Sequence, residues 1–126
     1  MFSHIMIGSN DIERSRTFYD ALFSAIGGKP ATQGPKGRLV YSHNGGRFII
    51  GKPMDGKPAT PANGGTIGFS VGSQAEGDAW HKAGVANGGQ AIEEPPGIRQ
   101  GATGPLYLAY LRDPDGNKLC ALYRMG

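Results

Sequence analysis

The sequence predicts an α+β domain in which two βαβββ modules form one curved mixed sheet with a concave cleft and the helices lie outside. Two observations lead to this prediction: the chain repeats its own pattern near its midpoint, and each half contains both strand-type and helix-type periodicity. Residues 2–8 (FSHIMIG) alternate along a strand, and residues 66–72 (TIGFSVG) repeat that alternation, with Thr66 standing 62 positions after His4. A unit of about sixty residues buries little surface alone, so the two units should share a core.

The repeat also predicts the domain organisation. We expect a single domain of residues 1–126, with the first module at 1–52 and the second at 66–126. Residues 53–65 (PMDGKPATPANGG) are rich in Pro and Gly and are therefore the expected linker.

Each repeated strand leads into a predicted helix. In the first half Asn10 or Asp11 can cap the helix, and apolar residues recur at helical spacing. The residues of that expected buried stripe are Ile12, Tyr19, Leu22, Phe23 and Ile26. In the second half Ser73 and Glu76 have the spacing of a capping box, which satisfies two amides reciprocally. The second helix is expected to present Ala79, Trp80 and Ala83.

The helices should end at glycine pairs and be followed by strands. The pairs are Gly27-Gly28 and Gly88-Gly89, and a short strand is expected after each. The longer strands are expected at residues 38–43, 47–52, 106–112 and 118–124. Asn44-Gly45-Gly46 should join the first two, and the sequence Asp-Pro-Asp-Gly-Asn at 113–117 should join the last two.

Strand alternation separates a side that faces the helices from an inner side. The inner side should carry His4, Met6 and Thr66 from the first strands of the modules, and Cys120 from the last strand. A curved sheet that is covered only on its outer side leaves a concave inner side, where a ligand would bind. Strand parity allows only one of Tyr107 and Tyr110 to face inward.

Residues 93–105 are expected to form a long Gly-rich loop. Two interpretations remain open for this segment. It is either a solvated connection or a lid over the cleft, in which Arg99 would grip an anionic group of a substrate.

Composition excludes several classes of protein. The formal charge is +3, and the basic residues are scattered, which disfavours a nucleic-acid surface. No segment approaches membrane-spanning length, and the first residues lack the pattern of a signal peptide. One cysteine cannot form an internal disulfide. We therefore expect a soluble cytoplasmic domain.

Taken in order, these features resemble the vicinal oxygen chelate superfamily. That group contains glyoxalase I, bleomycin-resistance proteins, fosfomycin-resistance enzymes and extradiol dioxygenases. The resemblance rests on the paired strand–helix–three-strand repeat, on the strand His-Ile-Met-Ile before a capped helix containing Phe18-Tyr19, and on the turn at 113–117. It covers nearly the whole chain and implies the same α+β fold, with a ligand site on the inner side.

Family members with metal chemistry place ligands at four inner positions, in the first and last strands of each half. The resemblance puts His4, Ile49, Thr66 and Cys120 at these positions, and only His4 matches the expected type of ligand. Cys120 stands where the family has a carboxylate, and Ile49 offers no lone pair. One imidazole cannot hold a divalent ion usefully, so we expect no metal cofactor. A zinc, nickel, manganese or iron ion is implied only if an altered site uses Cys120 with His4.

Two functions follow from these residues. The first is a metal-free protein that binds a small, partly apolar molecule in the cleft, as bleomycin-sequestering relatives do. The alternative is a metal-dependent lyase of the lactoylglutathione lyase type, or a dioxygenase, with an altered site. The candidate binding residues are His4, Met6, Thr66, Arg99, Tyr110 and Cys120. The resemblance also implies a homodimer in which pairing of modules completes the cleft.

Overall fold

The first half of the chain forms a four-stranded sheet and one α-helix in the computed structural model, which describes residues 1–125. Its elements are β1 (Ile5–Gly8), α1 (Ile12–Ser24), β2 (Thr32–Gln33), the 3-10 turn η1 (Pro35–Gly37), β3 (Leu39–His43) and β4 (Gly46–Gly51). The strand order is β1–β4–β3–β2, with β1 parallel to β4 and the other neighbours antiparallel.

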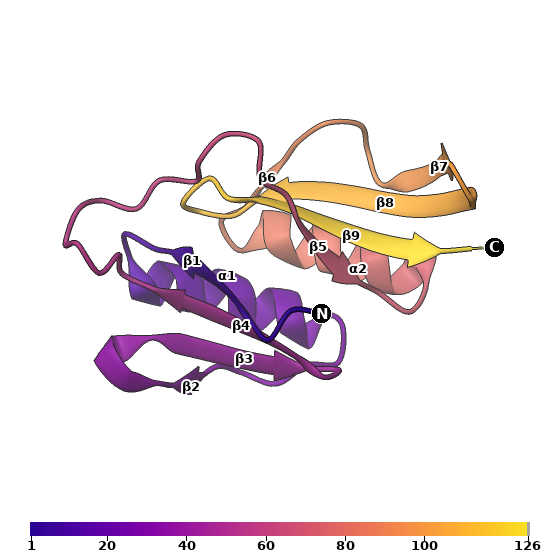
Figure 1. Cartoon of the computed structure of the whole chain (residues 1–126). Coiled ribbons are helices and arrows are strands. Elements are labelled where there is room, and N and C mark those ends of the chain that lie inside the picture. The colour runs from indigo at the N-terminus through magenta and orange to yellow at the C-terminus, as the bar shows by residue number, and fades with distance from the viewer. Residues whose placement is uncertain (126) are drawn as a thin grey trace.

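The second half repeats this arrangement with one additional strand. Its elements are β5 (Ile67–Ser70), α2 (Gln74–Ala86), β6 (Gln90–Ala91), β7 (Gly97–Gly101), β8 (Gly104–Arg112) and β9 (Lys118–Arg124). The strand order is β5–β9–β8–β6, with β7 also paired to β8 and β5 parallel to β9. Residues 53–65 run between the two halves without helix or strand (Figure 1).

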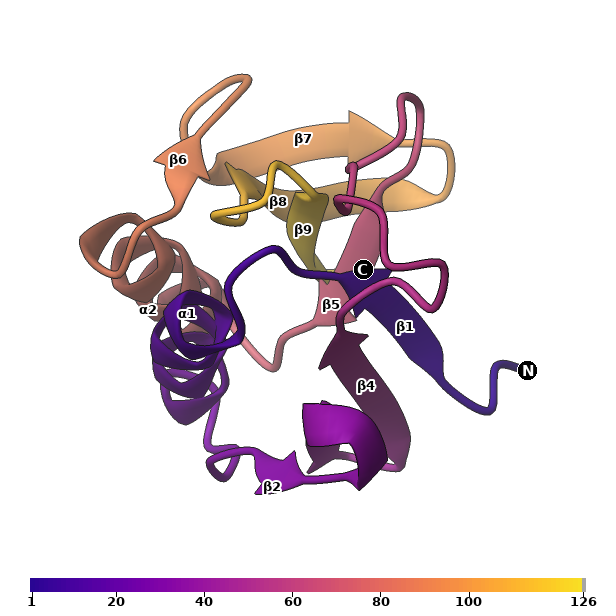
Figure 2. The same ribbon diagram turned by 90° about the vertical axis from the view of Figure 1, so that its left-hand side faces the viewer.

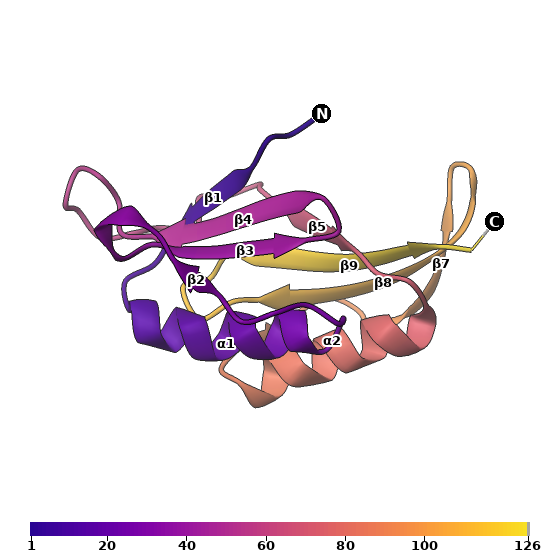
Figure 3. The same ribbon diagram turned by 90° about the horizontal axis from the view of Figure 1, so that it is seen from below.

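The register of the parallel strands confirms the internal repeat. Met6 of β1 lies opposite Ile49 of β4, and Gly68 of β5 lies opposite Cys120 of β9. The predicted α+β class and the two βαβββ modules are therefore confirmed. The strands form two hydrogen-bonded sheets, of four and five strands, instead of the single curved sheet that was expected, because β1 and β5 are not paired with each other. Both helices lie on the same side of the sheets (Figure 3), and they pack side by side (Figure 2).

The helix starts follow the predicted capping chemistry with one difference. The Asp11 carboxylate accepts a hydrogen bond from the Arg14 amide at 3.0 Å, which makes Asp11 the N-cap of α1. At α2, Ser73 Oγ accepts from the Glu76 amide at 3.0 Å, as expected. Glu76 Oε1 accepts from the Gly72 amide at 3.0 Å. The second arm of the predicted capping box thus lies one residue earlier than in the motif.

Both helices end at their glycine pairs, as the sequence predicts. Gly27 and Gly88 have φ of +81° and +101°, a backbone conformation that glycine adopts without steric cost. Gly28 and Gly89 each donate their amide hydrogen to the carbonyl five residues earlier, at 2.7 and 2.8 Å. These two bonds satisfy carbonyl groups that a helix end otherwise leaves free.

The buried side of α2 differs from the prediction. Ala79 is exposed, and the buried residues of α2 are Gly77, Trp80 and Gly84. A Cβ on Gly77 would lie 2.2 Å from a ring carbon of Tyr107, and one on Gly84 would lie 2.3 Å from Leu111 Cδ1. Glycine therefore lets α2 pack closely on its sheet, which apolar periodicity cannot reveal.

The prediction of one continuous loop at residues 93–105 is wrong. Residues Gly97–Gly101 form β7, which makes a tight antiparallel hairpin with β8 in which Gly101 lies opposite Gly104. The alternation of this strand is hard to recognise because Gly97 and Gly101 contribute no side chains and Pro95 and Pro96 precede them.

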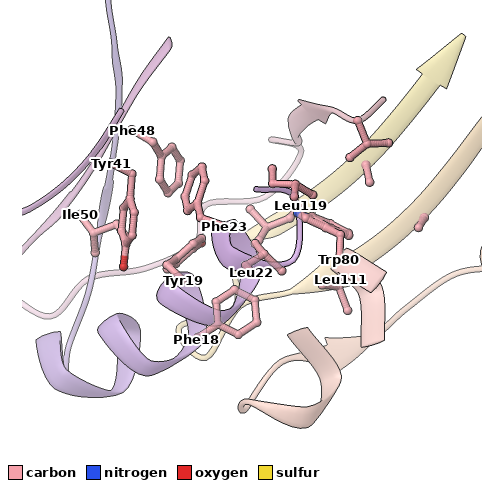
Figure 4. Packing of buried hydrophobic residues seen from close by; sticks show 14 of the residues in the cluster. Phe18, Tyr19, Leu22, Phe23, Tyr41, Phe48, Ile50, Trp80, Leu111 and Leu119 are labelled. Atoms are coloured by element: carbon pink, nitrogen blue, oxygen red, sulfur yellow. The ribbon is translucent and has the colours of Figure 1, made fainter. Parts of the chain in front are cut away.

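The hydrophobic core is shared by the two modules. Its largest fully buried side chains come from both helices and both sheets. Figure 4 shows Phe18, Tyr19, Leu22, Tyr41, Trp80, Leu111 and Leu119 among them, and Tyr107 is another. Among residues 1–125, no helix is long and apolar enough to cross a bilayer.

The turn at 113–117 joins the second module to α1 as well as connecting β8 to β9. Asp113 is only 4% exposed, and its carboxylate accepts from the Tyr19 hydroxyl at 2.6 Å. It also accepts from the Asp115 amide at 3.0 Å and from the amide and side chain of Asn117 at 2.8 and 2.9 Å. Tyr19 lies on α1, so this buried acceptor ties the two modules together.

Asp115 of the same turn fixes the start of α1. Its Oδ1 accepts from the Asn10 amide at 2.9 Å and from Arg14 Nη2 at 2.9 Å, while Oδ2 accepts from Ser15 Oγ at 3.2 Å. The turn therefore supplies acceptors for donors near the first turn of a helix that belongs to the other module.

Candidate functional site

The helix-free face consists of the sides of the two sheets that point away from α1 and α2. In the first sheet, Ile5 and Ile7 pack against the core, while Met6 between them is 39% exposed on the helix-free face. His4 directly precedes β1 and is exposed, with its Nδ1 2.8 Å from Ser3 Oγ. Thr66 directly precedes β5 in the second module and is also exposed.

Cys120 lies in the middle of the second sheet. It is 5% exposed and lies between Gly68 of β5 and Tyr110 of β8. Burial raises the pKa of the Cys120 thiol above its ordinary value and also raises the pKa of Tyr110. The cysteine is therefore a neutral thiol at neutral pH, which is neither a good nucleophile nor a ready metal ligand.

Two charged residues lie close to Cys120. The ammonium group of Lys118 lies 5.1 Å from the centroid of the Tyr110 ring and forms an ion pair with Glu93. Glu93 has φ of +58°, which is uncommon for a residue with a side chain. Strand alternation predicts that Lys118 of β9 lies on this face. Glu93 belongs to the segment between β6 and β7, and no pattern in the sequence predicts that it pairs with Lys118.

Arg99 lies on β7 and is held by its own segment. Its guanidinium forms an ion pair with Glu94 at 3.3 Å and donates to the Pro95 carbonyl at 2.8 Å. β7 places Arg99 on the helix-free face, where it lies opposite Leu106 of β8. The segment that was expected to be a loop over the cleft is therefore partly a strand, Gly97–Gly101, that pairs with β8.

The rest of the helix-free face is largely apolar. Leu106, Leu108 and Tyr110 of β8 and Leu122 of β9 are each only partly buried. Tyr107, in contrast, points to the other side, where its hydroxyl donates to Asp78 at 2.7 Å. These side chains therefore leave accessible apolar surface on the helix-free face of a single chain.

The side chains at the four family ligand positions do not suit a divalent metal. Ile49 offers no donor atom, Thr66 offers a hydroxyl, and burial keeps Cys120 protonated. Only the imidazole of His4 is a good ligand. Across residues 1–125, no group of three His, Cys, Asp or Glu side chains is arranged to hold a metal ion.

Comparison with known proteins identifies the family. The sequence model of the Glyoxalase/Bleomycin resistance protein/Dioxygenase superfamily matches residues 1–121. The chain belongs to this superfamily. Membership in the glyoxalase superfamily confirms the resemblance seen in the sequence, and with it the expected fold. A search of curated proteins found no match.

Solved structures of the glyoxalase superfamily have the same fold. A glyoxalase/bleomycin resistance protein from Albidiferax ferrireducens is 55% identical, with a TM-score of 0.95 over 98% of this chain and 99% of that one. A glyoxalase-related enzyme from Fulvimarina pelagi is 23% identical, with a TM-score of 0.73 over 98% of this chain and 88% of that one. At this lower identity the likeness concerns the fold alone.

Proposed function

We propose that this member of the glyoxalase superfamily binds a small, partly apolar molecule on its helix-free face without a resident divalent metal. The observation that carries the proposal is the set of side chains at the four ligand positions, where one imidazole stands with an isoleucine, a threonine and a protonated cysteine. The superfamily fold supports a ligand site on this face, but the donor set does not support metal chemistry there.

The composition of the face indicates the kind of ligand. Leu108, Leu122 and the ring of Tyr110 offer an apolar surface that gains free energy when an apolar ligand covers it. His4, Thr66 and the Lys118–Glu93 pair supply hydrogen-bonding groups around this surface. Such a site selects by shape and a few polar contacts, which suits sequestration of a ligand.

Metal titration tests the proposal. The purified protein is expected to carry no stoichiometric metal, because His4 is the only strong ligand at the four positions. The combined substitution Ile49→Glu, Thr66→His and Cys120→Glu should raise the affinity for Zn²⁺ by at least about a hundredfold, since it restores a set of nitrogen and oxygen ligands. Titration calorimetry with Zn²⁺, Ni²⁺ and Mn²⁺ measures this change.

A matched variant controls for shape. Ile49→Gln, Thr66→Asn and Cys120→Gln introduces side chains of similar size without carboxylates or imidazole, and it should gain little affinity. One tightly bound metal ion in the unmodified protein, lost in His4→Ala, would contradict the proposal. In that case the metal-dependent lyase or dioxygenase would be the better assignment.

We further propose that two copies pair through their helix-free faces to enclose this site. The support is the open apolar surface that a single chain leaves on both sheets, including Met6, Leu108 and Leu122. Two-fold pairing of identical chains is the commonest closed assembly, and it would place residues of both modules around one ligand.

Molar mass in solution tests the pairing. Light scattering at micromolar concentration should give the mass of a dimer, and Leu108→Glu should give that of a monomer because a carboxylate would be buried at the interface. Val85→Glu places the same charge at a residue on α2 that is 47% exposed, and it should leave the dimer intact. A monomeric mass for the unmodified protein would contradict the proposed pairing.

A further inference from the structure

A cavity of about 350 Å³ lies where the two modules meet. It is lined by residues of β1, α1, the β3–β4 hairpin and β5, and by Ile26, which follows α1. None of the six candidate residues of the helix-free face is among its lining residues. Its volume is within the range of small-molecule sites, about 300–1,000 Å³, so the cavity is a second candidate site.

Two glycines leave part of this space unfilled. Gly46 lies on the same side of β4 as Phe48, and a Cβ there would meet only the His43 carbonyl oxygen, at 3.5 Å. Gly68 also lines the cavity, and a Cβ there would have no such neighbour within 4 Å. β5, which carries Gly68, lies at the edge of its sheet beside β9. The hollow between the modules is therefore space that the sequence leaves free.

Three phenylalanines from both modules form the aromatic wall of the cavity. Phe69 of β5 lies at a centroid distance of 5.7 Å from Phe23 of α1 and 5.5 Å from Phe48 of β4, edge to face with both. The ring of Tyr41 stacks on Phe23 at 4.6 Å. Figure 4 shows Phe23 and Phe48 with their rings adjacent. Aromatic rings pack favourably in edge-to-face and offset geometries, so a further flat ring can join such a group.

The rest of the wall is apolar and incompletely buried. Ile5, Ile67 and Phe69 pack against the core but remain partly accessible. Apolar side chains that face a hollow keep a hydration cost, which an apolar ligand of suitable size would relieve. The interior therefore favours a hydrophobic, ring-containing molecule.

The interior offers no fixed charge to a ligand. Within residues 1–125, Arg47 is the one lining residue with a permanent charge. Phe48 is buried, whereas Arg47, its neighbour in β4, is exposed. Successive side chains of a strand point to opposite faces, so the guanidinium lies on the side away from Phe48. Because an unpaired charge is costly to bury, the cavity favours an uncharged ligand.

His43 provides a hydrogen-bonding group beside the aromatic wall. It follows the alternation of Leu39 and Tyr41, the buried residues of β3, and is itself partly buried. Its ring lies 6.1 Å from that of Phe23, centroid to centroid. The sequence predicts His43 as a solvent-facing residue, so this position differs from the prediction. An imidazole donates a hydrogen bond in both protonation states and therefore suits a ligand hydroxyl.

We propose that this cavity binds a small, neutral aromatic alcohol of the phenol class, with its rings against Phe23, Phe48 and Phe69 and its hydroxyl at His43. An apolar cavity of about 150 Å³ can hold one benzene ring, so this larger hollow has room for two fused rings. An aliphatic alcohol would lose the ring contacts. The site is separate from the helix-free face and does not depend on the function proposed there.

Calorimetry with 2-naphthol and 2-naphthoate tests the preference for a neutral ligand. The two probes have the same fused rings, but at neutral pH only 2-naphthoate is charged. The unmodified protein should bind 2-naphthol at least about tenfold more tightly, because the carboxylate would lose its hydration without gaining a partner.

His43→Leu tests the contact with the hydroxyl. The variant should bind 2-naphthol about fivefold more weakly, since one neutral hydrogen bond is lost. Its affinity for naphthalene, which has no hydroxyl, should change by less than about twofold. That difference between the two probes reports a direct contact and would not arise from a general loosening of the site.

A matched pair of glycine variants locates the binding. Gly46→Leu should fill the cavity and abolish binding of 2-naphthol and of naphthalene, with the thermal unfolding midpoint retained as a check on folding. Gly65→Leu adds the same side chain in the linker, where a Cβ would meet open space outside the cavity. It should bind both probes as the unmodified protein does.

Four outcomes would overturn the proposal. They are absence of 2-naphthol binding at millimolar concentration, binding of 2-naphthoate as tight as that of 2-naphthol, an unchanged affinity for 2-naphthol in His43→Leu, and unimpaired binding in a folded Gly46→Leu. Amide chemical shifts in ¹⁵N-labelled protein provide a readout that needs no variant. The shifts that 2-naphthol induces should centre on Phe48 and Phe69, and shifts centred on Tyr110 and Cys120 would place the probe on the helix-free face.

Discussion

Replacing Asp113 by alanine should lower the free energy of unfolding by about 3 kcal/mol, because four donors would lose a buried acceptor. These donors are the Tyr19 hydroxyl, the Asp115 amide, and the amide and side chain of Asn117. Burial raises the pKa of Asp113, and the hydrogen bonds from Tyr19 and Asn117 oppose this shift by stabilising the charged form. Urea denaturation followed by circular dichroism measures the change.

A matched aspartate provides the control. Asp55 lies exposed in the linker, and Asp55→Ala should change the free energy of unfolding by less than about 0.5 kcal/mol. Because Asp113 bonds to Tyr19 across the two modules, Asp113→Ala should shift one cooperative transition for the whole chain. Separate transitions for the two modules, or an equal loss in both variants, would show that the junction does not couple them.

Stability should fall steeply above pH 10, because three buried tyrosines each donate to a carboxylate. Tyr19, Tyr41 and Tyr107 are at most 2% exposed, and their hydroxyls lie 2.6, 2.6 and 2.7 Å from aspartate oxygens. Burial, reinforced by the neighbouring carboxylates, raises the pKa of all three. A raised pKa in the folded state means that the stabilisation is fully present below the unfolded value of about 10 and is lost above it.

The expected loss between pH 10 and pH 11 is about 1 kcal/mol for each tyrosine, or about 3 kcal/mol in total. Denaturation at a series of pH values measures it, and absorbance at 295 nm should show these tyrosines ionising only as the chain unfolds. Tyr41→Phe should reduce the slope of stability against pH by about a third. A stability that stays constant up to pH 11 would mean that the three hydroxyls ionise freely in the folded protein.

The sequence predicted those parts of the fold that leave a periodic pattern. The two long hairpins and the glycine ends of the helices have such patterns and are confirmed. In the stripe of α1, Tyr19, Leu22 and Phe23 are buried as expected, whereas Ile12 is only partly buried and Ile26 lies beyond the end of the helix. The packing side of α2 was missed because Gly77 and Gly84 fit by lacking a side chain. The strand β7 was missed because glycine stands at both of its ends.

Less of the site could be predicted. Strand alternation correctly separates Met6 and Tyr110 from the core, and the resemblance identifies the positions of Ile49 and Cys120. The partners of these residues come from distant segments, as the approach of Glu93 to Lys118 shows. A cavity of about 350 Å³ between the modules, lined by Phe23, Phe48 and Phe69 among others, could not be predicted. Aromatic residues at helical and strand spacing indicate burial but do not indicate the space left between them.

The parallel pairing in each half has a consequence for the order in which the chain folds. The β3–β4 hairpin closes through the two-residue turn Asn44-Gly45, whereas Ile5 of β1 meets Phe48 of β4 only after α1 and most of the module have been spanned. Closing a long loop costs more chain entropy than closing a short one, so local hairpins form ahead of distant strand pairs. We therefore expect β1 and β5 to join their sheets after the hairpins have formed. Ile5 and Phe69 lie on these strands and line a pocket between the two modules, so this pocket should take its shape late in folding.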